Sequence, residues 1–209
     1  MQVLYAYAAS AEGDAVANRL PEGLRIGVGK GASAAAMTER LCKDPQVDVV
    51  VLFGVCGAYP QADPPLEVSD LCMVGADMLA DEGLATGDGF ADLAQMELGT
   101  VGPFEQDRRF TARAAEFLGG VPIVRGATVS TCSGTDARSR EIHERTGAHV
   151  ETMEGAAVAM ACQRLGVPLV QLRCVSNRTG DRDAADMDLP RAITRLQVAI
   201  MRLVEKGWL

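Results

Sequence analysis

The feature of this sequence that most limits its fold is a series of short runs that are apolar at nearly every position. They are Val3–Ala8, Leu24–Val28, Val47–Phe53, Leu71–Asp77, Ile123–Thr131 and Leu169–Ser176. Short runs of this kind are typical of strands buried on both faces, as in parallel sheets covered by helices. None approaches the roughly 20 apolar residues that a membrane-spanning helix needs.

Segments with helical spacing alternate with these runs. They are Ser33–Leu41, Arg108–Leu118, Asp136–Thr146, Met153–Leu165 and Leu189–Lys206, and several of them end at glycines that suit helix C-caps. Alternating strands and helices predict an α/β protein with three layers, α/β/α, around a mixed and mostly parallel sheet. No stretch between these segments separates two cores, so we expect one domain over residues 1–209.

Composition limits which partners the protein can bind and in which compartment we expect it. The 209 residues carry a formal charge of −8 with no basic stripe, which disfavours nucleic acid as a partner. Two histidines and six scattered cysteines without a CxxC spacing leave little material for a metal site, and we expect no cofactor. The N-terminus lacks the pattern of a signal peptide, so we expect a cytoplasmic protein with no membrane association.

Four segments rich in glycine or polar residues follow predicted strands, where α/β sheets usually bind ligands. They are Gly27–Ser33, Phe53–Ala58, Val150–Ala157 and Arg173–Asp183. The glycines either form tight turns or let the backbone approach a ligand, as at Gly54. The carboxylates of Glu151 and Glu154 open a predicted helix, where they either complement its dipole or, for Glu154, bind sugar hydroxyls.

These segments, in this order, resemble the purine nucleoside phosphorylase and nucleosidase superfamily. The resemblance lies in Gly27–Ala36, Phe53–Ala58, Val68–Leu71, Val129–Gly134, Met153-Glu154 and Arg173–Asn177. Within it, Val150–Gly155 and Ser176–Asp183 most resemble the futalosine hydrolase branch, which releases hypoxanthine from futalosine on a route to menaquinone. The resemblance implies a nucleoside phosphorylase-like fold, cleavage of an N-glycosidic bond in a small nucleoside, and a homodimer or higher homo-oligomer.

The resemblance also implies roles at the sugar and its attacking group. Glu12 matches the carboxylate that activates water in the nucleosidases, and Asp14 is the alternative base. The other possibility is that Glu12 is an exposed surface residue without a catalytic role. Glu154 would bind the ribose hydroxyls and stabilise positive charge on the sugar, with Met153 packed beneath it.

Other residues would surround the base. Cys132 and Ser133 would border the purine, Ser176 would lie beside it, and Asn177 would either select a 6-oxopurine or cap a strand end. An amide offers one donor and one acceptor, whereas the related adenine-releasing enzymes have Asp there, so the source of the N7 proton is open among water, Asp181 and Asp183. Futalosine, the substrate that the resemblance implies, carries a benzoate-bearing extension at its 5′ end. Arg178 or Arg182 would pair with the carboxylate of that extension, or with Asp181 or Asp183.

Water is favoured over phosphate as the attacking group, because Gly27–Ser33 and Phe53–Ala58 contain no arginine and only Lys30 is cationic. The alternatives are a phosphate-dependent purine nucleoside phosphorylase, a nucleosidase for 6-aminopurine thio-nucleosides, and an inactive nucleoside-binding protein with the same fold.

Overall fold

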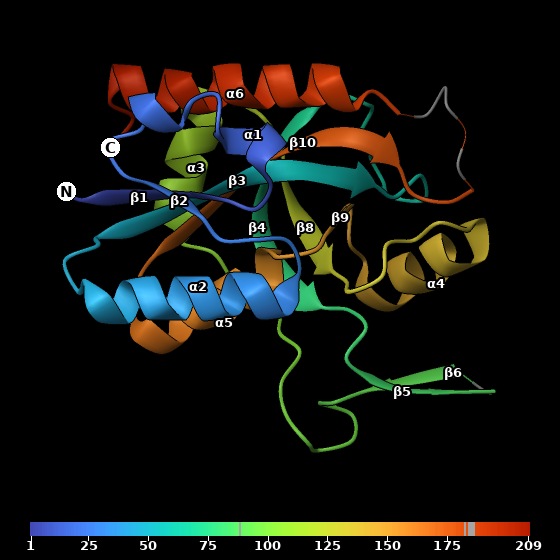
Figure 1. Ribbon diagram of the computed structural model, residues 1–209. Coiled ribbons are helices and arrows are strands. Elements are labelled where there is room, and N and C mark those ends of the chain that lie inside the picture. Colours follow the sequence, from blue (N-terminus) through green and yellow to red (C-terminus); the bar gives the residue numbers. More distant parts are fainter. Residues whose placement is uncertain (88, 182, 184–186) are drawn as a thin grey trace.

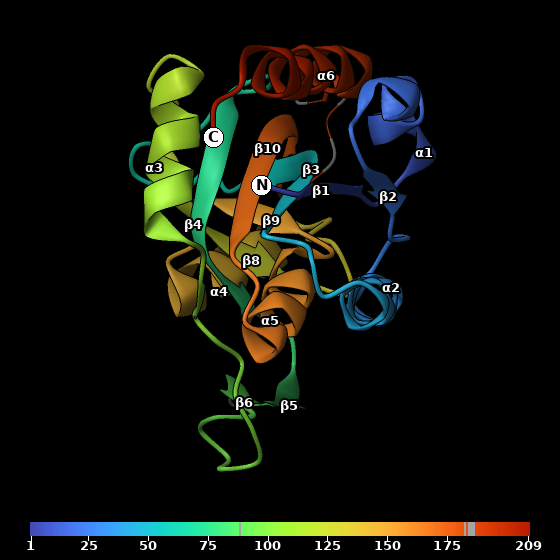
Figure 2. The ribbon, with the colours of Figure 1, turned by 90° about the vertical axis from the view of Figure 1, so that its left-hand side faces the viewer.

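A central sheet lies between helices on two faces (Figure 1), in a computed structural model that describes residues 1–87, 89–181, 183 and 187–209. Helices α3 (Arg108–Phe117) and α6 (Leu189–Lys206) cover one face. Helices α2 (Lys30–Lys43) and α5 (Gly155–Leu165) cover the other (Figure 2). The three-layer α/β/α prediction is confirmed.

Strand β3 (Val49–Ala58) shows why the apolar runs have no polar residue at every second position. Val49, Val51 and Phe53 pack into the core beneath α3 and α6. Val50 and Leu52 pack into the core beneath α2 and α5. Because successive side chains of a strand point to opposite faces, a sheet covered on both sides needs apolar residues at every position.

The sheet is mixed and mostly parallel, as predicted. Its strand order is β10-β4-β8-β9-β3-β1-β2, built from β1 (Val3–Tyr7), β2 (Gly23–Arg25), β3, β4 (Leu71–Leu79), β8 (Ile123–Thr128), β9 (Val150–Thr152) and β10 (Leu169–Arg178), with β7 (Phe104–Glu105) pairing with β4. Strand β10 also pairs with β3, so β3, β10, β4, β8 and β9 close into a ring. The antiparallel pairs are β10–β4, β3–β9 and β4–β7.

Two local expectations were wrong. Helix α5 begins at Gly155 and not at Met153, because Val150–Thr152 form strand β9 between β8 and β3. Three residues are too few for a periodic signal, so only pairing with neighbours reveals this strand. The stretch from Gly83 to Gly102 has five glycines and few periodic apolar positions, a pattern that predicts a flexible segment. It contains the hairpin of β5 (Gly83–Thr86) and β6 (Gly89–Asp92), which extends away from the body (Figure 1).

The remaining elements are short or capped as their residues predict. Helix α4 (Asp136–Thr146) starts after Thr135, whose side chain accepts a hydrogen bond from the Arg138 amide, and ends at Gly147 with φ of 62°. Helix α1 (Ser10–Gly13) and the 3-10 turn Ala17–Arg19 follow β1 and were not predicted. Within the described ranges, no helix is both long and apolar enough to cross a bilayer.

Candidate active site

A cavity of about 260 Å³ lies where β1, β3, β9 and β10 end. It is lined by eight of the nine residues that the sequence suggested for the site, which are Glu12, Cys132, Ser133, Met153, Glu154, Ser176, Asn177 and Arg178. Four separate stretches of the chain supply them. Parallel pairing of β3 with β1 and β10 brings two of those stretches to one edge, and antiparallel pairing of β3 with β9 brings a third. Such an edge is the usual ligand site of α/β sheets.

Glu12 is buried, with 6% of its surface exposed. It lies in α1 and turns back onto the loop after β1, where its Oε2 accepts hydrogen bonds from the amides of Ala8 (3.2 Å) and Ala9 (2.9 Å). Its Oε1 accepts a third from the amide of Val55, at 2.8 Å. The short helix and β3 therefore hold the carboxylate in one place at the cavity wall, contrary to the alternative of a surface position.

Glu154 lies directly before α5 and is 5% exposed. Its Oε1 accepts a hydrogen bond from the amide of Gly29 at 3.1 Å, and its Oε2 is 3.7 Å from Nη1 of Arg173. Burial raises the pKa of Glu154, the charge of nearby Glu12 acts in the same direction, and Arg173 and the Gly29 amide oppose them. Glu12 and Glu154 are thus close enough for their charges to interact.

Arg173 is a site residue to which sequence reasoning assigned no role. It is 1% exposed, and its guanidinium donates from Nε to Oε1 of Gln171 (2.9 Å) and from Nη1 to the carbonyl of Val55 (3.3 Å). Among the described residues, Nη2 has no hydrogen-bond partner. A buried cation in the middle of an apolar strand was the available signal, because such a charge needs an acidic partner.

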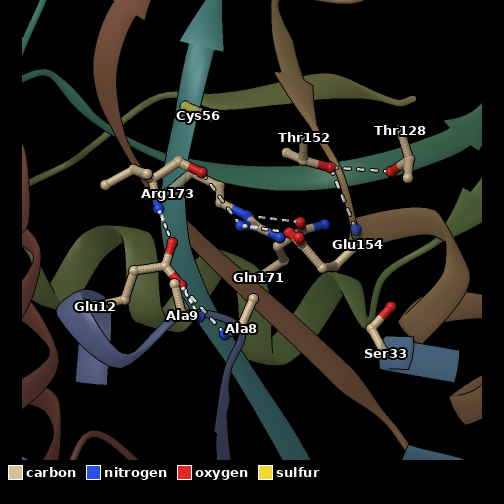
Figure 3. A network of polar contacts seen from close by, with 12 residues as sticks. Ala8, Ala9, Glu12, Ser33, Cys56, Thr128, Thr152, Glu154, Gln171 and Arg173 are labelled. Atoms are coloured by element: carbon tan, nitrogen blue, oxygen red, sulfur yellow. Dashed lines mark hydrogen bonds and ion pairs between the residues drawn. The ribbon is translucent and has the colours of Figure 1, made fainter. Parts of the chain in front are cut away.

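The network continues from Arg173 to Gln171, which Figure 3 shows side by side, and from there to Asp77 of β4. Gln171 Nε2 donates to Asp77 Oδ2 at 3.2 Å, and the hydroxyl of Thr128 donates to Oδ1 at 3.0 Å. The Thr128 oxygen in turn accepts a hydrogen bond from the amide of Ala156 in the first turn of α5. Burial raises the pKa of Asp77 to about 6. Hydrogen bonds thus connect Asp77 both to Arg173 and to the helix that carries Glu154.

Gly54 has a structural explanation. A Cβ at this position would lie 2.5 Å from Nη1 of Arg173 and 2.8 Å from Oε1 of Glu12. The glycine therefore leaves room for these two side chains to approach β3. Its contact with a substrate stays a prediction.

Asn177 and Ser176 lie at the end of β10 and line the same cavity as Glu12. The Ser176 hydroxyl donates to Oδ1 of Asn177 at 2.9 Å, and Nδ2 of Asn177 donates to the carbonyl of Arg178 at 2.9 Å. Each of these bonds uses one part of the amide, which keeps a second N–H and a second lone pair for other partners.

The charged residues suggested as alternatives have other contacts. Asp14 accepts a hydrogen bond from Tyr7 and pairs with Arg25 at the surface. Asp181 accepts one from the Asp136 amide, while Asp183 lines the cavity. Arg178 pairs with Glu67 at 2.6 Å, a partner that the sequence did not suggest. Arg182 lies outside the described residues.

Lys30, the cation of the glycine-rich segment, is 2.5 Å from Asp81 and 3.2 Å from Glu82, with only 10% of its side chain exposed. Its charge is therefore balanced within the fold. Of the residues whose placement is described, no three His, Cys, Asp or Glu side chains are grouped in a way that could hold a metal ion.

The chain is similar to known proteins along most of its length. The model of the phosphorylase superfamily matches residues 23–205. The chain is 36% identical to the futalosine hydrolase of Thermus thermophilus over 188 residues, covering 88% of this chain and 81% of that one. It is 35% identical to the futalosine hydrolase of Streptomyces coelicolor, covering 100% and 98%.

Solved structures share the fold. The native futalosine hydrolase of Helicobacter pylori superposes with a TM-score of 0.82 at 19% identity, covering 99% of this chain and 98% of that one. A methylthioadenosine/S-adenosylhomocysteine nucleosidase from Campylobacter jejuni superposes with a TM-score of 0.80 at 20% identity, covering 98% and 97%. With curated relatives above 30% identity over most of their length, the chain belongs to the futalosine hydrolase family of the phosphorylase superfamily.

Proposed function

We propose that this protein hydrolyses the N-glycosidic bond of futalosine and releases hypoxanthine, as part of menaquinone biosynthesis. The observation that carries the proposal is the placement of two buried carboxylates, Glu12 and Glu154, on one cavity wall beside the buried guanidinium of Arg173. The curated relatives named above, which are futalosine hydrolases, support the choice of substrate.

The sugar binds at Glu154. Its carboxylate accepts hydrogen bonds from the ribose hydroxyls, and its charge stabilises the cation that develops on the sugar as the bond to the base breaks. Arg173 and the Gly29 amide hold the carboxylate in position from behind. Met153, next in the chain and also on the cavity wall, packs beneath the ring.

Glu12 acts as the base for water. Three backbone amides fix its carboxylate, which leaves acceptor capacity for a proton from the attacking water.

Water is the attacking group in preference to phosphate. A phosphorylase needs cations free to bind a dianion, whereas Lys30 is paired with Asp81 and Glu82. Arg173 faces Glu154, so its charge is also opposed. Phosphate at this position would meet the carboxylates of Glu12 and Glu154 as well.

The base binds between Ser133 and Asn177, with Cys132 and Ser176 at its edges. The spare donor and acceptor of Asn177 suit O6 and a protonated N7 of a 6-oxopurine. Arg178 lines the cavity and binds the carboxylate of the 5′ extension, which competes with Glu67 for its guanidinium.

The test is release of hypoxanthine by the purified protein from futalosine and from inosine, with and without phosphate. We expect release from futalosine at the same rate in both buffers. Release that depends on phosphate would identify a phosphorylase, and tight nucleoside binding without release would identify a binding protein. The resemblance further implies a cytoplasmic homo-oligomer, whose size sedimentation of the purified chain measures.

A further inference from the structure

Glu151 is a second buried carboxylate on the cavity wall, and the reaction steps above do not use it. It lies in β9 and is 5% exposed. Its Oε2 accepts hydrogen bonds from the hydroxyls of Tyr59, at 2.8 Å, and of Ser133, and its Oε1 accepts one from the Ser133 amide at 2.8 Å. These three donors are uncharged.

Burying a carboxylate among uncharged donors costs free energy, so its presence on the cavity wall points to a role in binding. An ionised carboxylate has about four acceptor positions, and the three donors occupy three of them. Burial, together with the charge of Glu151, raises the pKa of Tyr59, which therefore keeps its proton and remains a donor. The remaining acceptor position of the carboxylate faces the cavity, so the ligand group that binds there must be a hydrogen-bond donor.

The position of Glu151 in the sheet, relative to Asn177, indicates which part of the substrate carries that donor. Gly57 of β3 pairs with Glu151 of β9 on one side and with Asn177 of β10 on the other. A Cβ at Gly57 would lie 3.3 Å from Nδ2 of Asn177 and 3.8 Å from Cβ of Glu151. Both side chains therefore stand on the same side of Gly57, two strands or about 10 Å apart along the sheet. The Thr179 methyl, 2.9 Å from such a Cβ, fills part of the space over Gly57, but Gly57 itself lines the cavity, so the edge of a flat ring can lie along its backbone between the two side chains.

We propose that Glu151 is a specificity-determining residue that accepts a hydrogen bond from N1–H of a 6-oxopurine, while Asn177 binds the O6 and N7 side of the same base. This inference rests on the proposed function and names the chemical class of base that the site takes.

The chemistry discriminates between the two common purine types. In hypoxanthine N1 carries a proton and donates, whereas in adenine N1 is unprotonated and has a lone pair. A 6-aminopurine in the same pose would place that lone pair against the carboxylate, which leaves two acceptors facing each other in a buried site. Sites built around a specific hydrogen bond strongly reject analogues that cannot make it.

The experiment compares kcat/KM for futalosine with kcat/KM for its 6-amino analogue in the wild type and in Glu151→Gln. The hydroxyls of Tyr59 and Ser133 can donate or accept, so they can rotate to suit the glutamine amide. Its NH2 group donates to an unprotonated N1 and opposes N1–H. We expect the ratio of the two kcat/KM values, 6-oxo over 6-amino, to fall by at least about tenfold, the low end for a hydrogen bond to a charged group.

Tyr59→Phe is the matched control, because it removes a hydrogen bond to the same carboxylate but leaves the charge in place. We expect its ratio to remain within about twofold of the wild type, within the scatter usual for a contact that does not touch the substrate. Should Glu151→Gln not fold, Glu151→Asp keeps the charge but withdraws it from the base, and the ratio again falls.

An equal loss of kcat/KM on both substrates in Glu151→Gln would overturn the inference, since it would mean that Glu151 only holds Ser133 in place. If the wild type releases no base from either substrate, the proposed function fails instead. Calorimetry of free hypoxanthine and adenine binding to the wild type and to Glu151→Gln then tests the inference independently. A ratio of hypoxanthine affinity to adenine affinity that is the same in both proteins would refute it.

Discussion

At the residue scale, the site is built from carboxylates that are buried and held by hydrogen bonds from backbone amides. Glu12 shows how this is achieved, because the turn after β1 and the middle of β3 each present amides to it. Hydrogen bonds to a charged group stabilise it by about 1.5–3 kcal/mol each, which offsets much of the cost of burial. The three amides thereby fix the carboxylate in one orientation at the cavity wall.

Glu12→Gln tests the role of that charge. We expect kcat for futalosine hydrolysis to fall by about 10²–10⁴-fold, because glutamine cannot accept a proton from water, and KM to change little. Steady-state kinetics with hypoxanthine detection measures both.

Asp14→Asn is the control for that variant, since Asp14 is the neighbouring acid but faces Tyr7 and Arg25. Its kcat should match the wild type. If Asp14→Asn lost as much activity as Glu12→Gln, the assignment of the base to Glu12 would be wrong.

At the element scale, the start of α5 determines where Glu154 lies. Gly155 is its first residue, and a Cβ there would lie 2.1 Å from Oδ2 of Asp77 and 2.4 Å from Oε1 of Gln171. The glycine lets the helix begin directly above this polar pair, which brings Glu154 to Arg173. Packing and polar contacts at one helix end are therefore coupled to the position of Glu154, the proposed sugar-binding residue.

Gly155→Ala is expected to lower the free energy of unfolding by about 1–3 kcal/mol, as overpacking of a close contact usually does, and to lower kcat as Glu154 is displaced. Urea unfolding and kinetics measure the two effects. The matched control is Gly31→Ala in α2, where a Cβ meets nothing within 4 Å, and the helix should gain up to about 1 kcal/mol. A Gly155→Ala protein as stable and active as wild type would contradict this account.

At the scale of the whole molecule, Asp77 makes stability depend on pH. It connects β4 to β8 through Thr128 and to β10 through Gln171, and its pKa is raised from 3.8 to about 6 because it is buried. A carboxyl whose pKa is raised on folding favours the folded state when protonated. Its contribution is fully present below about pH 4 and is lost as the pH rises through about 6.

Asp77→Asn removes this titration. Between pH 4 and pH 7.5 we expect the wild type to lose about 2–3 kcal/mol of unfolding free energy relative to the variant, since each pKa unit corresponds to about 1.4 kcal/mol. Urea unfolding at the two pH values gives the difference. A gap between the proteins that is the same at both values would show that Asp77 does not titrate in this range.

Much of the fold could be predicted from local pattern. The runs that became β1, β3, β4, β8 and β10 are apolar at successive positions, and α4 and α5 end at Gly147 and Gly166 in the left-handed conformation. These signals are local because strand and helix periodicity, and the freedom of glycine at positive φ, act within a few residues. Strand β9 and the hairpin β5–β6 carried too little periodicity to be found.

The candidate site divides in the same way. The sequence by itself determined the residue types after each strand, and its motifs were enough to select Glu12, Glu154 and Asn177. Only the tertiary structure decided that Arg173 faces Glu154, that Asp77 supports them through Gln171, and that Glu151 stands beside Asn177 across Gly57. These contacts join residues far apart in the chain, and strand pairing and burial, which depend on the whole sheet, set their distances and charges.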